Sequence, residues 1–281
     1  MLDDASLIVQ VERFLSKRFE DNSAHGVSSF QYNEVLHLFP TEHSEIFTEL
    51  NNGFHYTNIE LINIIKTALS NSGFDSTPKL TSGLIPRPLN ASAYFYKSAG
   101  SLNAESVLYK KTLLLIRLAS FMSRADFKID REEVHVVEEM LNSNHGLSTK
   151  EKASLLSKFY YLCDLESILD EREDSFVKAS LKKDTIYGVV SEYPPNQQRE
   201  VINFLIDLII ADGELDKREH SNLKELYRMC DLNARTAIRE IELRAKERHI
   251  LLGSKPETVV FDDDEDLYAD DLLSDLLADF E

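Results

Sequence analysis

Acidic residues recur at one spacing in two stretches of the chain, RADFKIDREE at 124–133 and IADGELDKRE at 210–219. Each stretch has an aspartate after an alanine, a second aspartate four residues later, and a glutamate three residues beyond that. Carboxylate oxygens are the ligands that calcium and magnesium prefer. The pattern therefore predicts a divalent-metal site with six candidate ligands: Asp126, Asp130, Glu133, Asp212, Asp216 and Glu219.

The second stretch also suits an ordinary corner between two helices. Gly213 can adopt the left-handed conformation that ends a helix, while Asp216 can cap the next helix and Glu219 can complete a capping box. Asp212 is harder to explain, because a carboxylate at the end of a helix meets the negative end of the macrodipole. Two interpretations stay open: Asp126 and Asp212 attract a hard cation, or Asp212 accepts a nearby backbone N–H in an Asx-turn.

An EF-hand is excluded for the second stretch. Its two ligand positions upstream of Asp212 would fall on Leu208 and Ile210, and neither side chain can coordinate a cation.

Apolar residues at helical spacing flank both acidic stretches. Those beside the first copy correspond in position to those beside the second: Leu115, Leu118, Met122, Val137 and Met140 to Val201, Phe204, Leu208, Leu223 and Leu226. Each copy is predicted to be a helix, a tight corner and a second helix. The two hairpins are expected to bury their apolar stripes against each other with pseudo-twofold symmetry.

The fold class predicted for the whole chain is all-α, because no convincing run of β-branched alternation interrupts the helical spacing. Four segments are expected: a small helical N-terminal domain at 1–70, a Pro/Gly/Ser-rich linker at 71–102, a helical domain with both repeats at 103–252, and an acidic-hydrophobic tail at 253–281. Proline and glycine lead us to expect no regular element in the linker. Tyr94, Phe95 and Tyr96 are expected to pin its end to a neighbouring surface.

The repeat resembles the TerB-like family, the tellurite-resistance helical domain that also occurs in the cytoplasmic part of a membrane-anchored bacterial co-chaperone. The resemblance covers about residues 105–249 and rests on LIIADGELDKREHSNLKEL and, more weakly, FMSRADFKIDREEVHVVEEML. It implies an all-helical domain with surface acidic residues, possible divalent-metal binding, and a scaffold role in bacterial responses to tellurite, other stress and phage. The sequence departs from the family at Phe127, where the first copy should have glycine.

The tail DDLLSDLLADFE has the pattern of a short amphipathic helix that folds on a partner. Its predicted partner-binding residues are Leu272, Leu273, Leu276, Leu277 and Phe280, with Asp271 and Asp275 on the polar face. The expected partner is a protein with a basic or hydrophobic groove, and FDDDEDLYADD could also mimic nucleic acid on that partner. The alternatives are a solubilising tail, or one that folds back on the chain's own basic residues: Arg235, Arg239, Arg244, Lys246 and Arg248.

Charge and composition limit the function classes. The net charge is −18, and the 11 acidic residues after Lys255 leave residues 1–255 with 38 acidic and 31 basic residues. Such a body is not expected to bind nucleic acid directly, and no apolar stretch predicts membrane insertion. Cys163 and Cys230 are expected to be buried thiols. We expect a cytoplasmic protein.

No catalytic residue is predicted. The sequence contains no GxGxxG, Walker A, HExxH or nucleophile-elbow motif, and its histidines are interpreted as surface or half-buried residues. The predicted function is a non-enzymatic bacterial interaction or scaffold protein of a stress-response or phage-defence complex. A calcium-sensing module that uses the Ala-Asp-Gly corners is the alternative, and a metal-dependent hydrolase ranks last.

Overall fold

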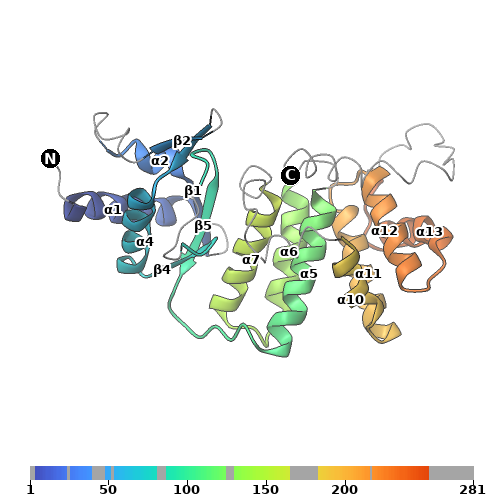
Figure 1. The fold of residues 1–281 in the computed structure, drawn as a ribbon. Helices are drawn as coiled ribbons and strands as arrows, with labels where there is room; N and C mark the ends of the chain where they lie inside the picture. Colours follow the sequence, from blue (N-terminus) through green and yellow to red (C-terminus); the bar gives the residue numbers. More distant parts are fainter. Residues whose placement is uncertain are drawn as a thin grey trace. The chain divides into compact units, whose positions relative to one another are not determined.

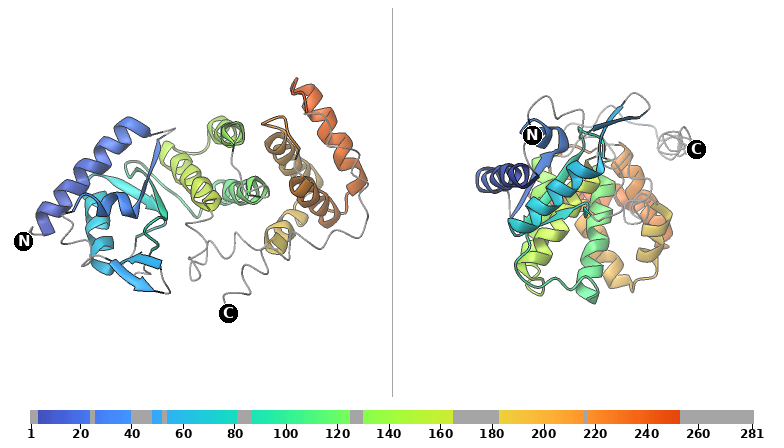
Figure 2. Two further views of the ribbon diagram at one scale, coloured as in Figure 1. Left: turned by 90° about the horizontal axis from the view of Figure 1, so that it is seen from above. Right: turned by 60° about the vertical axis from the view of Figure 1, so that its left-hand side comes forward.

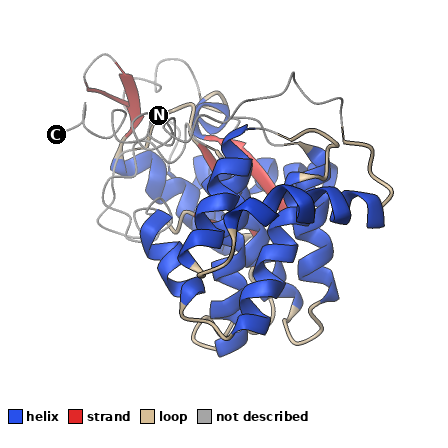
Figure 3. Ribbon diagram, turned by 90° about the vertical axis from the view of Figure 1, so that its right-hand side faces the viewer, coloured by secondary structure: helices blue, strands red, loops and turns tan. Residues whose placement is uncertain are grey.

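The computed structural model describes residues 4–23, 26–39, 48–51, 54–80, 87–124, 130–164, 183–215 and 217–252. Helices make up most of this part of the chain, which confirms the predominantly helical fold class (Figure 3). The contacts divide the chain into two compact units, residues 1–121 with 137–186 and residues 122–136 with 187–281. The pseudo-twofold packing of the two hairpins stays a prediction.

Two long helices form one layer of the first unit. α1 (Asp4–Asn22) and α4 (Ile59–Asn71) lie side by side (Figures 1 and 2). Leu7, Val11 and Leu15 of α1 form one buried stripe. α4 begins where the Asn58 side chain caps the helix by accepting the N–H of Leu61 at 3.0 Å.

A three-stranded antiparallel sheet packs against these helices, with the strand order β1-β5-β4. β1 spans Val27–Gln31, β4 spans Phe74–Thr77 and β5 spans Ser92–Lys97. The short helix α2 (Tyr32–Leu36) follows β1 directly. A separate antiparallel pair joins β2 (Thr48–Asn51) to β3 (Phe54–Thr57).

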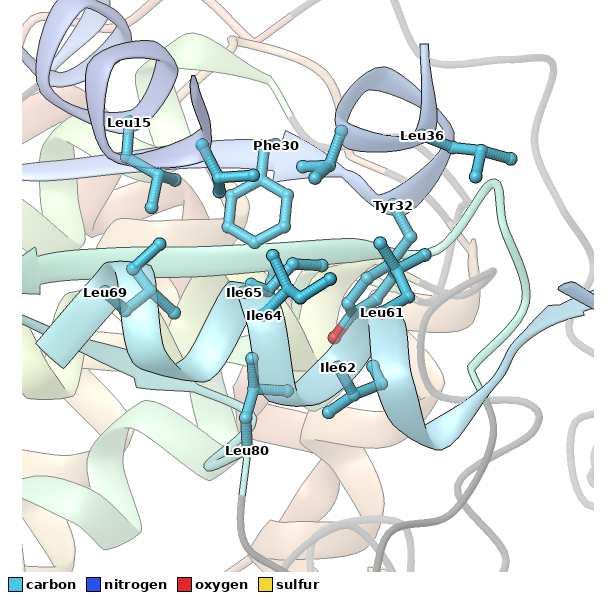
Figure 4. Close-up of a cluster of buried hydrophobic side chains, with 14 of the residues drawn as sticks. Leu15, Phe30, Tyr32, Leu36, Leu61, Ile62, Ile64, Ile65, Leu69 and Leu80 are labelled. Atoms are coloured by element: carbon cyan, nitrogen blue, oxygen red, sulfur yellow. The ribbon is translucent and has the colours of Figure 1, made fainter. Parts of the chain in front are cut away.

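The first face of β5 contributes to the core beneath α1 and α4. Ala93 and Phe95 are fully buried there, and the Phe95 ring centroid lies 5.8 Å from that of Phe30 and 5.1 Å from that of Phe74. Figure 4 shows Phe30 of β1 and Leu15 of α1 facing the apolar side chains of α4. This core therefore joins all three strands of the sheet to both helices.

The second face of the sheet is covered by α7 (Thr149–Cys163). The ring of Tyr94 in β5 stacks on that of Tyr160 at a centroid distance of 5.8 Å, which places the predicted aromatic anchor on a neighbouring helix. In β4, the hydroxyl of Thr77 lies 2.9 Å from that of Ser157, and both residues are buried. Because alternate residues of a strand face opposite sides, the sheet forms the middle layer between α1 with α4 and α7.

Two further helices precede α7. α5 spans Val107–Ser123 and α6 spans Arg131–Ser143. The hydroxyls of Tyr109 in α5 and Ser154 in α7 lie 3.1 Å apart, and the hydroxyl of Tyr160 donates to Glu138 of α6 at 3.5 Å. Glu151 completes a capping box at the start of α7 and also accepts the N–H of Asn103 at 3.0 Å.

The second unit contains helices from the C-terminal half of the chain. α10 spans Lys183–Ser191, α11 spans Pro195–Ile209 and α12 spans Lys217–Met229, followed by the 3-10 turn η1 (Ala234–Thr236) and α13 (Ala237–Glu247). The chain breaks around Tyr193, between α10 and α11, with Pro195 in the first turn of α11. α13 contacts both α11 and α12.

Two expectations about the N-terminal part were wrong. The stretch 71–102 contains β4 and β5, although no regular element was expected. Its prolines lie between the two strands and Gly73 and Gly100 lie outside them, which leaves SAYFYK free to pair on both sides. The N-terminal part also contains β1, β2 and β3 as well as helices. Burial of β5 on both faces hid the polar alternation by which a half-exposed strand is recognised.

The contact between α7 and the sheet predicts that Ser157→Leu destabilises the protein. Ser157 is fully buried beside Thr77, so the larger side chain must displace its neighbours, at a cost of about 1–3 kcal/mol. The measurement is the urea midpoint of unfolding. Ser143→Leu, the same change at an exposed position of α6, should stay within about 0.5 kcal/mol. Equal shifts for both variants would contradict the three-layer packing.

Candidate functional site

The corner that follows α11 is the better described of the two acidic stretches. α11 ends at Ile209, and the N–H of Ala211 donates to the carbonyl of Leu208 at 3.1 Å. The N–H of Gly213 then donates to the carbonyl of Ile210 at 3.1 Å. These bonds satisfy carbonyls that the helix end would otherwise leave without partners.

Asp212 forms an Asx-turn at this corner. Its carboxylate Oδ1 accepts the backbone N–H of Glu214 at 2.8 Å, while its side chain is exposed. The second of the two interpretations left open by the sequence therefore describes this contact. The bond accounts for an aspartate at the end of a helix without a bound cation.

Gly213 has the predicted left-handed conformation, with φ of +83°. It also permits a close approach, because a Cβ at this position would lie 3.1 Å from the carbonyl oxygen of Leu251. The segment that follows α13 thus passes directly over the corner. Both features call for glycine at this place.

The six predicted metal ligands are engaged differently at the two corners. Glu133 is buried and its carboxylate accepts the N–H of Asp130 at 3.0 Å, as the glutamate of a capping box does. Glu219 is buried at the matching position of α12. Asp126 and Asp216 lie outside the described residues. Within the part of the chain that the structure describes, no group of three or more metal-binding side chains is assembled, and the metal site stays a prediction.

A buried carboxylate that the sequence did not single out lies on α11. Asp207 is 6% exposed, and its two oxygens accept from Arg244 Nε at 2.6 Å and from Arg244 Nη2 at 2.8 Å. Arg248 Nη2 donates to the same carboxylate at 2.6 Å. The hydrogen bond from Arg244 to Asp207 is the main cause that raises the pKa of this guanidinium. The pair ties α11 to α13.

The signal for this cluster was present in the sequence. Asp207 interrupts the apolar run VINFLIDLII, and Arg244 and Arg248 are four residues apart, as partners on one helix face are. The run was interpreted only as an apolar stripe, and the arginines only as part of a basic helix. Pairing them requires knowledge of which helices pack together.

Two further titratable groups of α12 are held in states unsuited to proton transfer near neutral pH. Burial and, to a lesser extent, Lys224 lower the pKa of His220 to about 4. His220 is fully buried, so its interpretation as a surface or half-buried residue was wrong. Burial, followed by the hydrogen bond that its hydroxyl donates to Glu240, raises the pKa of Tyr227. Glu240 also pairs with Arg199 of α11.

The elements described so far define a helical-hairpin domain whose second corner is closed by an Asx-turn, a left-handed glycine and a buried ion pair. Residues 112–240 match the family model of tellurite resistance protein TerB. This match confirms the resemblance carried by the repeat. No curated protein and no solved structure matches the chain. Among the described helices, none is both long and apolar enough to cross a membrane.

The matched segment includes α7, on which the N-terminal sheet packs. The sheet itself lies before the match. The predicted partner-binding residues of the tail, Leu272, Leu273, Leu276, Leu277, Phe280, Asp271 and Asp275, lie outside the described residues.

The change from aspartate to asparagine should lower the stability of the protein at position 207 and leave it almost unchanged at position 212. Asp207→Asn removes the charge that two arginines share in a buried place, and should lower the free energy of unfolding by about 2 kcal/mol. Asp212→Asn keeps an Asx-turn acceptor and should change it by less than about 0.5 kcal/mol. Urea unfolding of both variants measures the difference, and equal losses would contradict these roles.

The Asp212→Asn variant also tests the metal interpretation. A site at the corner would give the parent protein a higher melting temperature in calcium than in chelator, and Asp212→Asn would abolish that rise. A rise that Asp212→Asn abolishes would confirm the predicted metal site, and no rise in the parent would contradict it.

A change from glycine to alanine should destabilise the protein at position 213 and stabilise it at position 188. Gly213→Ala should cost about 1–2 kcal/mol through its positive φ, and its Cβ would also press on the carbonyl of Leu251. Gly188 lies inside α10, and an alanine Cβ there would meet nothing within 4 Å, so Gly188→Ala should stabilise by about 0.5–1 kcal/mol. Thermal melting compares them, and a stabilised Gly213→Ala would overturn this account of the corner.

Proposed function

We propose that the protein is a non-catalytic adaptor of a bacterial stress-response or phage-defence complex, related to tellurite resistance and acting in the cytoplasm. The observation that carries the proposal is the TerB match over residues 112–240. The adaptor holds an N-terminal α/β layer on its TerB-like helices and recruits a protein partner through its C-terminal tail.

The contacts at the second corner support a structural rather than a catalytic role for its polar residues. The Asp207 carboxylate is neutralised by Arg244 and Arg248, and that of Asp212 accepts a backbone N–H. The low pKa of His220 keeps the imidazole neutral near pH 7. An acid or base for catalysis needs a pKa near the working pH and access to a substrate, and the buried His220 has neither.

The tail is the partner-binding segment in this proposal. Its leucines and Phe280 recur on one face of a predicted helix, with aspartates on the other. A peptide of this kind docks by burying its apolar face in a groove, and its aspartates favour a basic rim around that groove. Solubility alone would require the charges and not the leucines.

The proposal predicts that partner capture from lysate of the native host depends on the apolar face of the tail. Tagged full-length protein should retain a partner that the chain ending at Lys255 loses. Leu276→Asp with Phe280→Ala should lose the same partner, because the apolar face can no longer be buried. Quantitative mass spectrometry of the captured proteins is the measurement.

A matched control adds a charge to the polar face of the tail. Ser274→Asp should leave capture unchanged, since residue 274 lies off the apolar face in the predicted helix. Equal capture by the full-length chain, the truncated chain and the Leu276→Asp, Phe280→Ala variant would refute the role of the tail.

A further inference from the structure

The solvent-facing side of α13 combines a large apolar side chain with positive charge. Leu243 is 51% exposed, although α13 buries Ala237, Ile241 and Ala245 on its other side. Arg239 and Lys246 are exposed four residues before and three residues after Leu243, so the three share one helix face. Arg235 extends the row one turn earlier, from η1. We call these four residues the α13 stripe.

The cations of the stripe differ from the other basic residues of this helix. Arg244 and Arg248 are held by Asp207, and Arg244 also contacts Glu247 at 3.3 Å. Arg235, Arg239 and Lys246 form no ion pair with another residue in the described ranges. Glu242 and Glu247 are the exposed acidic residues beside Leu243, and Glu247 is paired with Arg244, so the three cations of the stripe still outnumber the acidic side chains next to them.

We propose that the α13 stripe is the intramolecular docking site of the chain's own segment 271–281. The segment offers the complementary pattern, with Leu276 and Leu277 between Asp275 and Asp279, and Phe280 directly after Asp279. All 11 charged residues after Lys255 are acidic. The rest of the chain is also negative overall, so most of its surface repels this segment. A positive, partly apolar row therefore suits this segment: its leucines can be buried there, and its aspartates gain electrostatic attraction that offsets the cost of desolvating them.

The chain length allows this contact. The described chain ends at Leu252, five residues after α13, and residues 253–270 connect it to the docking segment. A flexible connection of this length has a root-mean-square span of about 23 Å, similar to the roughly 16 Å length of an 11-residue helix. Short flexible connections give effective concentrations in the millimolar range, so even a weak contact is populated.

Intramolecular docking would regulate the proposed adaptor function. The contact itself does not depend on that function, whereas its regulatory role rests on it. A protein partner must compete with the α13 stripe for the same leucines. The docked tail would thus set a threshold affinity that a partner has to exceed.

Paramagnetic relaxation enhancement on the purified full-length chain tests the contact without any partner. A spin label is attached at Ser274→Cys, and the two native cysteines are both buried, so the introduced thiol is the accessible one. Amide signals of Arg239, Leu243 and Lys246 should lose most of their intensity, because a millimolar contact at a millimolar effective concentration is occupied about half of the time and brings the label close to these amides. Signals from the exposed face of α1 should keep theirs.

Two sets of variants assign the loss to the two surfaces. Arg239→Glu with Lys246→Glu should restore the signals, as should Leu276→Asp with Phe280→Ala. Lys110→Glu with Lys111→Glu, the same charge reversal on an exposed part of α5, should leave the loss unchanged. All these positions are exposed or lie in the tail, and melting temperatures verify that the variants are folded.

A mixed sample separates the possible occupants. Spin-labelled chain without isotope is added to isotope-labelled chain without a spin label, and no loss of signal is expected. Loss in the mixture would assign the stripe to a second copy and overturn the intramolecular proposal, as would a loss centred elsewhere or no loss at all. The capture experiment can fail while this one succeeds, so the two proposals are distinguishable.

Discussion

Burial of β5 on both faces is the constraint on which the first unit depends. Its backbone pairs with β1 and β4, Phe95 points into the core under α1 and α4, and Tyr94 stacks on Tyr160 of α7. A slip of one residue would exchange the two sets of side chains, so the register is specified by both layers at once. The N-terminal layer and α7 of the TerB-like segment consequently share one folded structure.

The second unit depends on a buried ion pair that joins α11 to α13. Burying the Asp207 carboxylate is costly alone, and Arg244 and Arg248 offset that cost while fixing α13 on α11. α13 in turn leads Leu251 over Gly213. The glycine of the Ala-Asp-Gly corner is therefore explained by the fold, as is the Asx-turn of Asp212. Two carboxylates of the predicted ligand set thus have structural contacts, since Asp212 accepts the N–H of Glu214 and Glu133 accepts that of Asp130.

The proposed function uses surfaces that these cores leave available. α13 is tied down by its buried residues and by Asp207, which leaves Leu243 exposed between Arg239 and Lys246. The tail carries the opposite charges around its own leucines. An adaptor whose recruiting segment has a weak site on the same chain can respond to partners without any catalytic step.

The sequence alone determined the helical class and the TerB-like corner, because each depends on spacing within a few residues. It also supplied the left-handed Gly213, and left the Asx-turn of Asp212 as one of two possibilities. The tertiary structure decided that residues 92–97 form a central strand, since the pairing partners lie far away in the chain. It likewise decided that Asp207 meets Arg244 across 37 positions, because only the packing of α11 against α13 brings these charges together.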